Sequence, residues 1–132
     1  MRILIDTNVI ISAIVFPKSK TACVFKHILE CHVPVICTYS VKESYTVFKR
    51  KFPDKITVLD EFFHDIDCEY FPAPETIEPS EFPDIRDIND LPILASAILS
   101  KVDVLLTGDK DFTEVRIKSP LVLSPAEYYE LL

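Results

Sequence analysis

Short apolar runs alternate along the chain with longer segments whose apolar residues recur at helical spacing. Residues 3–5 form a continuous aliphatic run, which is typical of a fully buried strand. Residues 21–31 instead place large apolar side chains on one face of a helix, and residues 8–16 fit either element. By the same criteria we expect strands at 35–37, 68–71, 102–106 and 121–123, and helices at 40–51, 53–65, 90–100 and from 125 onward.

Strands that alternate with helices in this way predict an α/β domain built on a mostly parallel sheet. The chain has 132 residues, which is the size of one domain, and no linker long enough to divide it. We therefore expect residues 1–132 to form a single domain. Residues 72–83 hold four prolines and several acids, which predicts an extended loop.

Two of the expected helices carry start signals that include an acid. Ser40 is followed three residues later by Glu43, which is the spacing of a capping box. Asp90 begins the segment DLPILASAILS, in which Pro92 occupies the first turn of the helix. Both acids are thus expected at helix N-termini.

Composition excludes several classes of enzyme. Gly108 is the only glycine, so neither a P-loop nor a dinucleotide-binding glycine-rich loop can form. The chain also lacks the G-x-S-x-G motif of α/β-hydrolases. The net charge of −7 does not favour nucleic-acid binding, unless some of the acids bind a metal ion that reverses the local charge.

Cysteine usage and hydropathy predict a cytoplasmic protein. No apolar run is long enough to span a membrane, and no signal-peptide cleavage pattern follows the N-terminal segment. A zinc site is conceivable at Cys23, His27 and Cys31, which recur at four-residue intervals. Tetrahedral zinc sites usually take ligands from two segments, however, so we favour thiols that bind no metal. The chain has no C-x-x-C pair, and we expect small buried side chains in a reducing compartment at Cys23, Cys31, Cys37 and Cys68.

Acidic residues follow two of the expected strands. Asp6 comes directly after residues 3–5, and Asp109 closely follows residues 102–106. Ligands of open parallel sheets bind outside the carboxyl ends of the strands, so these two acids meet if their strands are neighbours. Three further acids are expected at the same edge, namely Glu43, Asp90 and Asp111.

Each of these acids also has an explanation as a local structural residue. Asp6 would bond to its own turn, Asp90 would be a helix cap, and Glu43 would complete a capping box. Asp109 and Asp111 would be ordinary turn residues. The functional interpretation rests on the combination of the five acids. If each acid had only a local structural reason, all five would have to lie at one sheet edge by coincidence.

Carboxylates that lie this close repel one another, and some stay protonated unless a cation intervenes. Mg²⁺ and Mn²⁺ are hard ions that take oxygen ligands of this kind. Such ions lower the pKa of an attacking water and stabilise a leaving oxygen, which suits hydrolysis of a phosphodiester. The acids therefore predict a divalent metal site.

Three segments resemble motifs of the PIN-domain nucleases: ILIDTNVIISA at 3–13, RDINDLPILASAI at 86–98 and LLTGDKDF at 105–112. The resemblance extends over essentially the whole chain and is greatest to prokaryotic PIN proteins described as toxins of toxin–antitoxin pairs. It implies a three-layer α/β/α sandwich whose parallel sheet has about five strands in the order 3-2-1-4-5. It also implies an endoribonuclease that uses Mg²⁺ or Mn²⁺ and leaves a 5′-phosphate and a 3′-hydroxyl.

The resemblance assigns roles to individual residues. It implies catalytic roles for Asp6, Glu43, Asp90 and Asp109. It implies metal ligation by Asp6, Asp90, Asp109 and Asp111. The polar side chains of Asn8 and Thr107 match residues that orient the aspartates. Asp87, three residues before Asp90, could face the same metal or the solvent.

The same resemblance implies partners for the chain, namely an RNA substrate and a small antitoxin protein. Basic residues that could contact phosphate are Lys42, Lys110, Arg116 and the run 49–51, although a basic run also suits a helix C-terminus. Because an acidic monomer offers few clustered basic residues, we expect a homodimer or higher homo-oligomer that shares an RNA groove.

Three alternatives stay open at this point. The same nuclease chemistry could serve RNA processing or decay without an antitoxin. The chain could also be a non-catalytic PIN-like interaction domain. A phosphate-accepting domain of the response-regulator type fits poorly, because the expected third strand ends at Phe71 and Pro72 rather than at an aspartate.

Overall fold

The computed structural model describes residues 1–132 and contains one five-stranded parallel sheet in the order β3-β2-β1-β4-β5. This is the predicted strand order. β1 lies at the centre and pairs with β4 so that Ile5 is opposite Leu106, which brings the carboxyl ends of the two strands together. The strands are β1 (Arg2–Ile5), β2 (Val33–Cys37), β3 (Glu69–Phe71), β4 (Val104–Leu106) and β5 (Leu121–Leu123).

Seven α-helices and three short 3₁₀ turns connect the strands. The helices are α1 (Thr7–Val15), α2 (Lys20–Cys31), α3 (Thr38–Lys51), α4 (Ile56–Asp65), α5 (Leu91–Leu99), α6 (Lys110–Thr113) and α7 (Pro125–Glu130). The 3₁₀ turns are η1 (Pro53–Lys55), η2 (Pro79–Glu81) and η3 (Ile88–Asp90). The segment between β3 and α5 is otherwise irregular, as its prolines predict.

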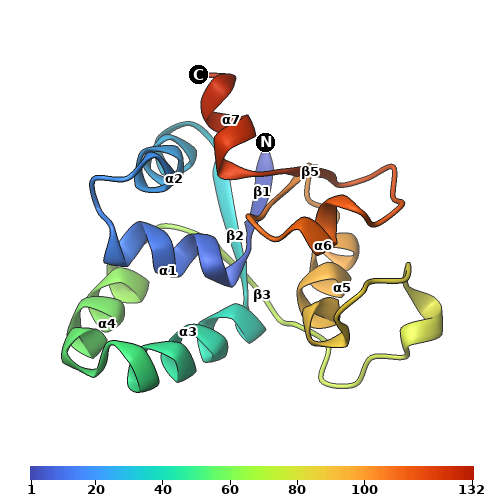
Figure 1. The fold of residues 1–132 in the computed structure, drawn as a ribbon, viewed down its shortest axis with the longest axis horizontal. Helices are drawn as coiled ribbons and strands as arrows, with labels where there is room; N and C mark the ends of the chain where they lie inside the picture. Colours follow the sequence, from blue (N-terminus) through green and yellow to red (C-terminus); the bar gives the residue numbers. More distant parts are fainter.

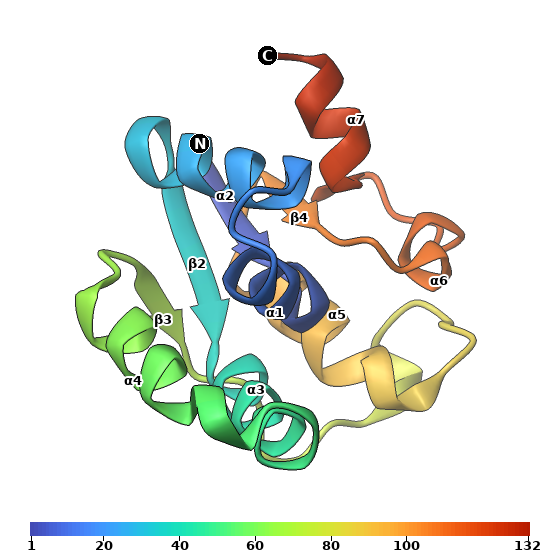
Figure 2. The same cartoon turned by 60° about the vertical axis from the view of Figure 1, so that its left-hand side comes forward.

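The sheet separates two hydrophobic cores, which confirms the three-layer arrangement. Ile3 and Ile5 of β1 pack with residues of α1, α2 and α7, whereas Leu4 packs with residues of α5 and α6. Figure 1 shows α1, α2, α4 and α7 on one side of the strands and α5 and α6 on the other. The turned view in Figure 2 shows α3 at the end of the sheet toward which β2 points. The alternation within β1 follows from the two-residue period of a strand.

The start of α3 differs from the prediction. The helix begins at Thr38 with Cys37 at its N-cap, and no side chain caps it. The expected cap at Ser40 is wrong, because the Ser40 hydroxyl is buried and accepts a hydrogen bond from the Thr7 hydroxyl at 2.9 Å. Glu43 therefore lies in the second turn and completes no capping box. The ambiguous segment at 8–16 is a helix, α1.

The cysteines are less buried than expected. Cys37 is buried and Cys68 is partly buried, but Cys23 and Cys31 are exposed, so the prediction is wrong for these two. They lie on α2 outside the face that Val24 and its neighbours bury against the sheet. His27 does not face a zinc site; its Nδ1 lies 2.8 Å from the Tyr128 hydroxyl.

By length and apolar composition, none of the helices could cross a membrane on its own. The pair α1 and α2 passes the same test only when taken together, across a bend of 109°.

Candidate metal centre

Asp6 is fixed at the point where β1 passes into α1. Its backbone N–H donates to the carbonyl of Leu106 at 3.0 Å, so the ladder between β1 and β4 extends to this residue. Its Oδ1 accepts from the Thr7 N–H at 2.7 Å, and its Oδ2 accepts from the Thr107 hydroxyl at 2.7 Å. The side chain is thus held by both of the strands that meet at this edge.

The environment of Asp6 raises its carboxyl pKa to about 6. Burial is the largest cause, since the residue is only 5% exposed and desolvation disfavours the anion. The hydrogen bonds from Thr107 and Thr7 oppose this effect, and the negative charges of Glu43 and Asp109 add to it. Asp6 therefore titrates closer to neutral pH than an ordinary aspartate, mainly because it is buried.

Asp90 stands at the N-cap position of α5, but its side chain makes no capping hydrogen bond. The local cap is instead Asp87, whose Oδ1 accepts from the Asn89 N–H at 3.0 Å at the start of η3. Oδ2 of Asp90 is buried and has no hydrogen-bond partner. Buried carboxylate oxygens normally have a partner, so this atom requires an explanation other than helix capping.

Asp109 and Asp111 follow β4 at the start of the short helix α6. Oδ1 of Asp109 accepts from the Asp111 N–H at 2.9 Å, and its own N–H donates to the Thr107 hydroxyl at 3.0 Å. Gly108, which lies between Thr107 and Asp109, adopts no left-handed conformation and has open space where a side chain would stand. Thr107 therefore connects Asp109 to Asp6 through its single hydroxyl.

Three of the predicted metal ligands gather in one place. Asp90, Asp109 and Asp111 each offer an oxygen, and these oxygens lie within 4.8 Å of one another. Asp6 is not one of this compact group, although its charge and those of Asp90 and Asp109 affect one another. Both Asp6 oxygens accept a hydrogen bond, yet each keeps a second lone pair.

The environment of Asp90 raises its carboxyl pKa to about 7. Burial is the largest cause, and the negative charge of Asp109 is the next. The charges of Asp87 and Asp6 act in the same direction. Without a cation, Asp90 therefore keeps its proton over much of the neutral range.

The other predicted residues occupy different positions around this group. Glu43 is partly buried, and its Oε2 lies 3.4 Å from the Tyr39 hydroxyl. Its charge reaches Asp6, but it does not join the compact group. Asn8 is exposed, and its side chain makes no hydrogen bond to an aspartate. Thr107 does contact Asp6, and exposed Asp87 points to the backbone of η3.

Two residues at the site were not singled out from the sequence. Arg86 donates from Nε to Oδ1 of Asp111 at 2.8 Å, which makes the only ion pair to the group. Tyr39 bridges two segments, because its hydroxyl also lies 3.4 Å from the carbonyl of Asn89. The presence of Arg86 in the motif RDINDLP was the one available signal, since a basic residue four positions before Asp90 is unusual among so many acids.

The donor set fits a divalent cation. Five carboxyl groups meet at this edge, and Arg86 supplies the only positive charge that pairs with any of them. Carboxylate oxygens are the ligands that Mg²⁺ and Mn²⁺ prefer. The buried Oδ2 of Asp90 would gain a partner from such an ion. The residues that could hold it are Asp90, Asp109 and Asp111, with Asp6 beside them.

Comparisons with known proteins bear on the family and the fold of the chain. A family model described as a PIN domain matches residues 2–111. Among solved structures, the VapBC2 structure from Rickettsia felis, bound to a DNA fragment from its promoter, contains a chain that is similar over 94% of this chain and 98% of its own. The two are 19% identical with a TM-score of 0.70, which shows a shared fold. No curated protein matches the chain by sequence.

We expect the metal-free protein to lose thermal stability as the pH rises from about 5 to 8. The folded pKa values of Asp6, about 6, and Asp90, about 7, lie above the usual 3.8. The folded state therefore binds these two protons more tightly than the unfolded state does. The stability gained in this way is complete below the unfolded pKa and is lost as the pH rises through 6 and 7. Thermal melts in chelator should show this fall, and Asp90→Asn should raise Tm at pH 8 by a few degrees.

Asp87→Asn is the matched control for that measurement, because Asp87 is exposed and an asparagine caps η3 equally well. Its melting curve should keep most of the wild-type fall with pH, because the charge of Asp87 is a smaller cause of the raised Asp90 pKa than burial or Asp109. A wild-type Tm that is flat or rises between pH 5 and 8, with Asp90→Asn parallel to it, would contradict the electrostatic account.

Proposed function

This chain belongs to the PIN domain family, a family of nucleases, and on that premise we propose that it is a divalent-metal-dependent endoribonuclease. One observation carries the proposal, namely the group of Asp90, Asp109 and Asp111 oxygens within 4.8 Å of one another, with an unpartnered buried oxygen on Asp90. A cluster of this kind has little use in a purely structural role, because its members repel one another.

The metal ligands in this proposal are Asp90, Asp109 and Asp111, with Asp6 completing the site through its free lone pairs. A bound Mg²⁺ or Mn²⁺ ion would lower the pKa of the attacking water and offset the charge of the phosphate. Thr107 holds Asp6 and Asp109 in register, since its hydroxyl donates to the first and accepts from the backbone of the second. A change at Thr107 would therefore loosen both acids.

Glu43 is the acid best suited to accept a proton from the attacking water. Its only side-chain contact is with the Tyr39 hydroxyl at 3.4 Å, so it is less constrained than Asp6. It lies on α3 and is partly buried, and its charge reaches Asp6. In-line attack would then leave a 5′-phosphate and a 3′-hydroxyl on the RNA.

We further propose that the chain is a toxin held inactive by a small antitoxin protein in the cytoplasm. The Rickettsia felis structure that shares its fold is a VapBC2 assembly on promoter DNA, and it is this likeness that supports the proposal. The free thiols of all four cysteines suit a reducing compartment.

Replacement of Asp109 by Asn should reduce RNA cleavage at least 100-fold without loss of the fold. The substitution removes one charge from the metal group, whereas the side-chain oxygen can still accept from the Asp111 N–H. Cleavage of a mixture of RNAs is measured in Mg²⁺, in Mn²⁺ and in EDTA, with circular dichroism as the check on folding.

Asp87→Asn is again the control, and we expect it to retain most of the wild-type rate of RNA cleavage, because Asp87 caps η3 and its charge is only a smaller influence on Asp90. Full activity of Asp109→Asn, or of the wild type in excess chelator, would contradict a metal-dependent mechanism. A strong loss in Asp87→Asn would instead make Asp87 part of the site.

We also propose that RNA binding requires a homodimer or higher homo-oligomer. One copy carries a net charge of −7, so a basic groove would have to be assembled from more than one copy. Size-exclusion chromatography should give an apparent mass of at least twice 15.1 kDa. A plain monomer that still cuts RNA would show that this part is wrong.

A further inference from the structure

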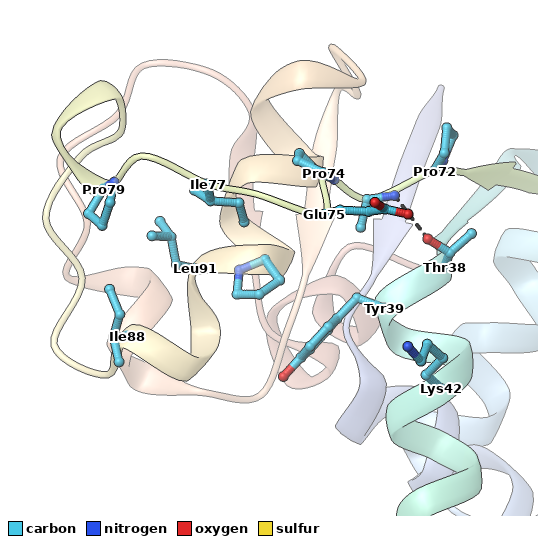
Figure 3. A pocket seen from close by; sticks show the side chains of 12 residues that line it. Thr38, Tyr39, Lys42, Pro72, Pro74, Glu75, Ile77, Pro79, Ile88 and Leu91 are labelled. Atoms are coloured by element: carbon cyan, nitrogen blue, oxygen red, sulfur yellow. Dashed lines mark hydrogen bonds between the residues drawn. The ribbon is translucent and has the colours of Figure 1, made fainter.

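A cavity of about 660 Å³ lies directly beside the acidic group. Its floor and walls come from the first turns of α3 and α5 and from the proline-rich segment after β3 (Figure 3). Ile88 and Leu91, which flank Asp90 on either side, both line it. The nuclease proposal leaves this cavity without a role.

Tyr39 is the wall that the cavity and the acidic group share. Its ring lines the cavity (Figure 3). Its hydroxyl lies 3.4 Å from Oε2 of Glu43 and 3.4 Å from the carbonyl of Asn89. A molecule that rests on this ring therefore lies next to the acids. None of the five acids lines the cavity itself, so Tyr39 and the segment around Asp90 are what connect it to the candidate site.

The lining combines flat and apolar groups with a few polar ones. Pro72, Pro74 and Ile77 line the cavity from the loop, and Tyr39 lines it from α3. Lys42 lies one turn beyond Tyr39 on α3 and is the only positive charge of the lining. The Thr38 hydroxyl accepts from the Ala73 N–H at 2.9 Å, which ties the loop to α3 and keeps the cavity in shape.

We infer that this cavity binds the base of one RNA nucleotide next to the scissile phosphate, with the base stacked on Tyr39 and its phosphate near Lys42. The inference rests on the nuclease function proposed above. The volume lies within the range of about 300–1,000 Å³ typical of sites for small organic molecules. An aromatic ring beside a lysine is the combination that single-stranded nucleic acids require, since bases stack and phosphates need a positive charge.

A bound protein segment suits the cavity less well. An extended peptide is usually recognised along a sheet edge, and a helical one in a long apolar groove. This cavity lies instead at the ends of two helices, and it is lined by Ile88 and Leu91, which lie close in sequence to the metal-ligand candidate Asp90.

The test uses short RNA oligonucleotides that contain one cleavage site, with an abasic nucleotide placed in turn at each position around it. For the wild type, we expect one position adjacent to the cleaved bond at which loss of the base lowers kcat/KM by about 5- to 150-fold, the range for one stacked base. Tyr39→Leu should lower kcat/KM on the intact RNA by a similar factor. It should also show no further penalty from the abasic substitution, because the two changes remove the same contact.

Two variants serve as controls. Tyr39→Phe keeps the ring and loses only the hydroxyl, so it should retain the abasic penalty. Tyr45→Leu makes the same change as Tyr39→Leu on the same helix, but Tyr45 packs against Phe63 and does not line the cavity, so the penalty should stay at its wild-type size. Circular dichroism melts verify that each variant is folded.

The possible outcomes separate this inference from the function on which it rests. An abasic penalty that is absent at every position, or that is unchanged in Tyr39→Leu, would overturn the base site while leaving RNA cleavage intact, and a protein segment would then be the better occupant. Failure of the wild type to cleave any RNA in Mg²⁺ or Mn²⁺ would overturn both proposals together.

Discussion

Repulsion among carboxylates at one edge of the sheet is the constraint on which the site depends. Asp6, Asp90, Asp109, Asp111 and Glu43 come from four separate parts of the chain, and only Arg86 pairs with any of them. Burial raises the pKa of Asp6 to about 6 and that of Asp90 to about 7, and the charges of the neighbouring acids add to the effect in both. A fold that keeps these groups together without a cation would do so at the expense of its own stability, so the arrangement is best explained by a bound divalent ion.

The fold creates this proximity through the pairing of β1 with β4. Because the two strands are parallel and in register, their carboxyl ends deliver Asp6 and Thr107 to adjacent positions, and the Thr107 hydroxyl then links Asp6 to Asp109. The two hydrophobic cores on either face of the sheet hold this register, since β1 contributes buried residues to both. The position of the acids is therefore a consequence of the whole domain rather than of one loop.

Much of this arrangement could be predicted from the sequence because it depends on short-range patterns. Aliphatic runs identify the strands, and the rule that parallel strands share a carboxyl edge brings Asp6 and Asp109 together. The capping pattern at Ser40 misled, because a buried contact with Thr7 replaced the local hydrogen bond that the pattern predicts. Whether Asp90 or Asp87 acts as the cap also depends on tertiary structure. The Arg86 to Asp111 ion pair spans 25 residues, so no local pattern could have shown it.

The central claim is that the crowded carboxylates require a divalent ion, and calorimetric titration with Mn²⁺ at neutral pH tests it most directly. The account predicts saturable binding to the wild-type protein, with release of protons from the acids of raised pKa. It also predicts that Asp90→Asn weakens this binding at least tenfold. Absence of Mn²⁺ binding by the folded wild type, or equal binding by Asp90→Asn, would contradict it.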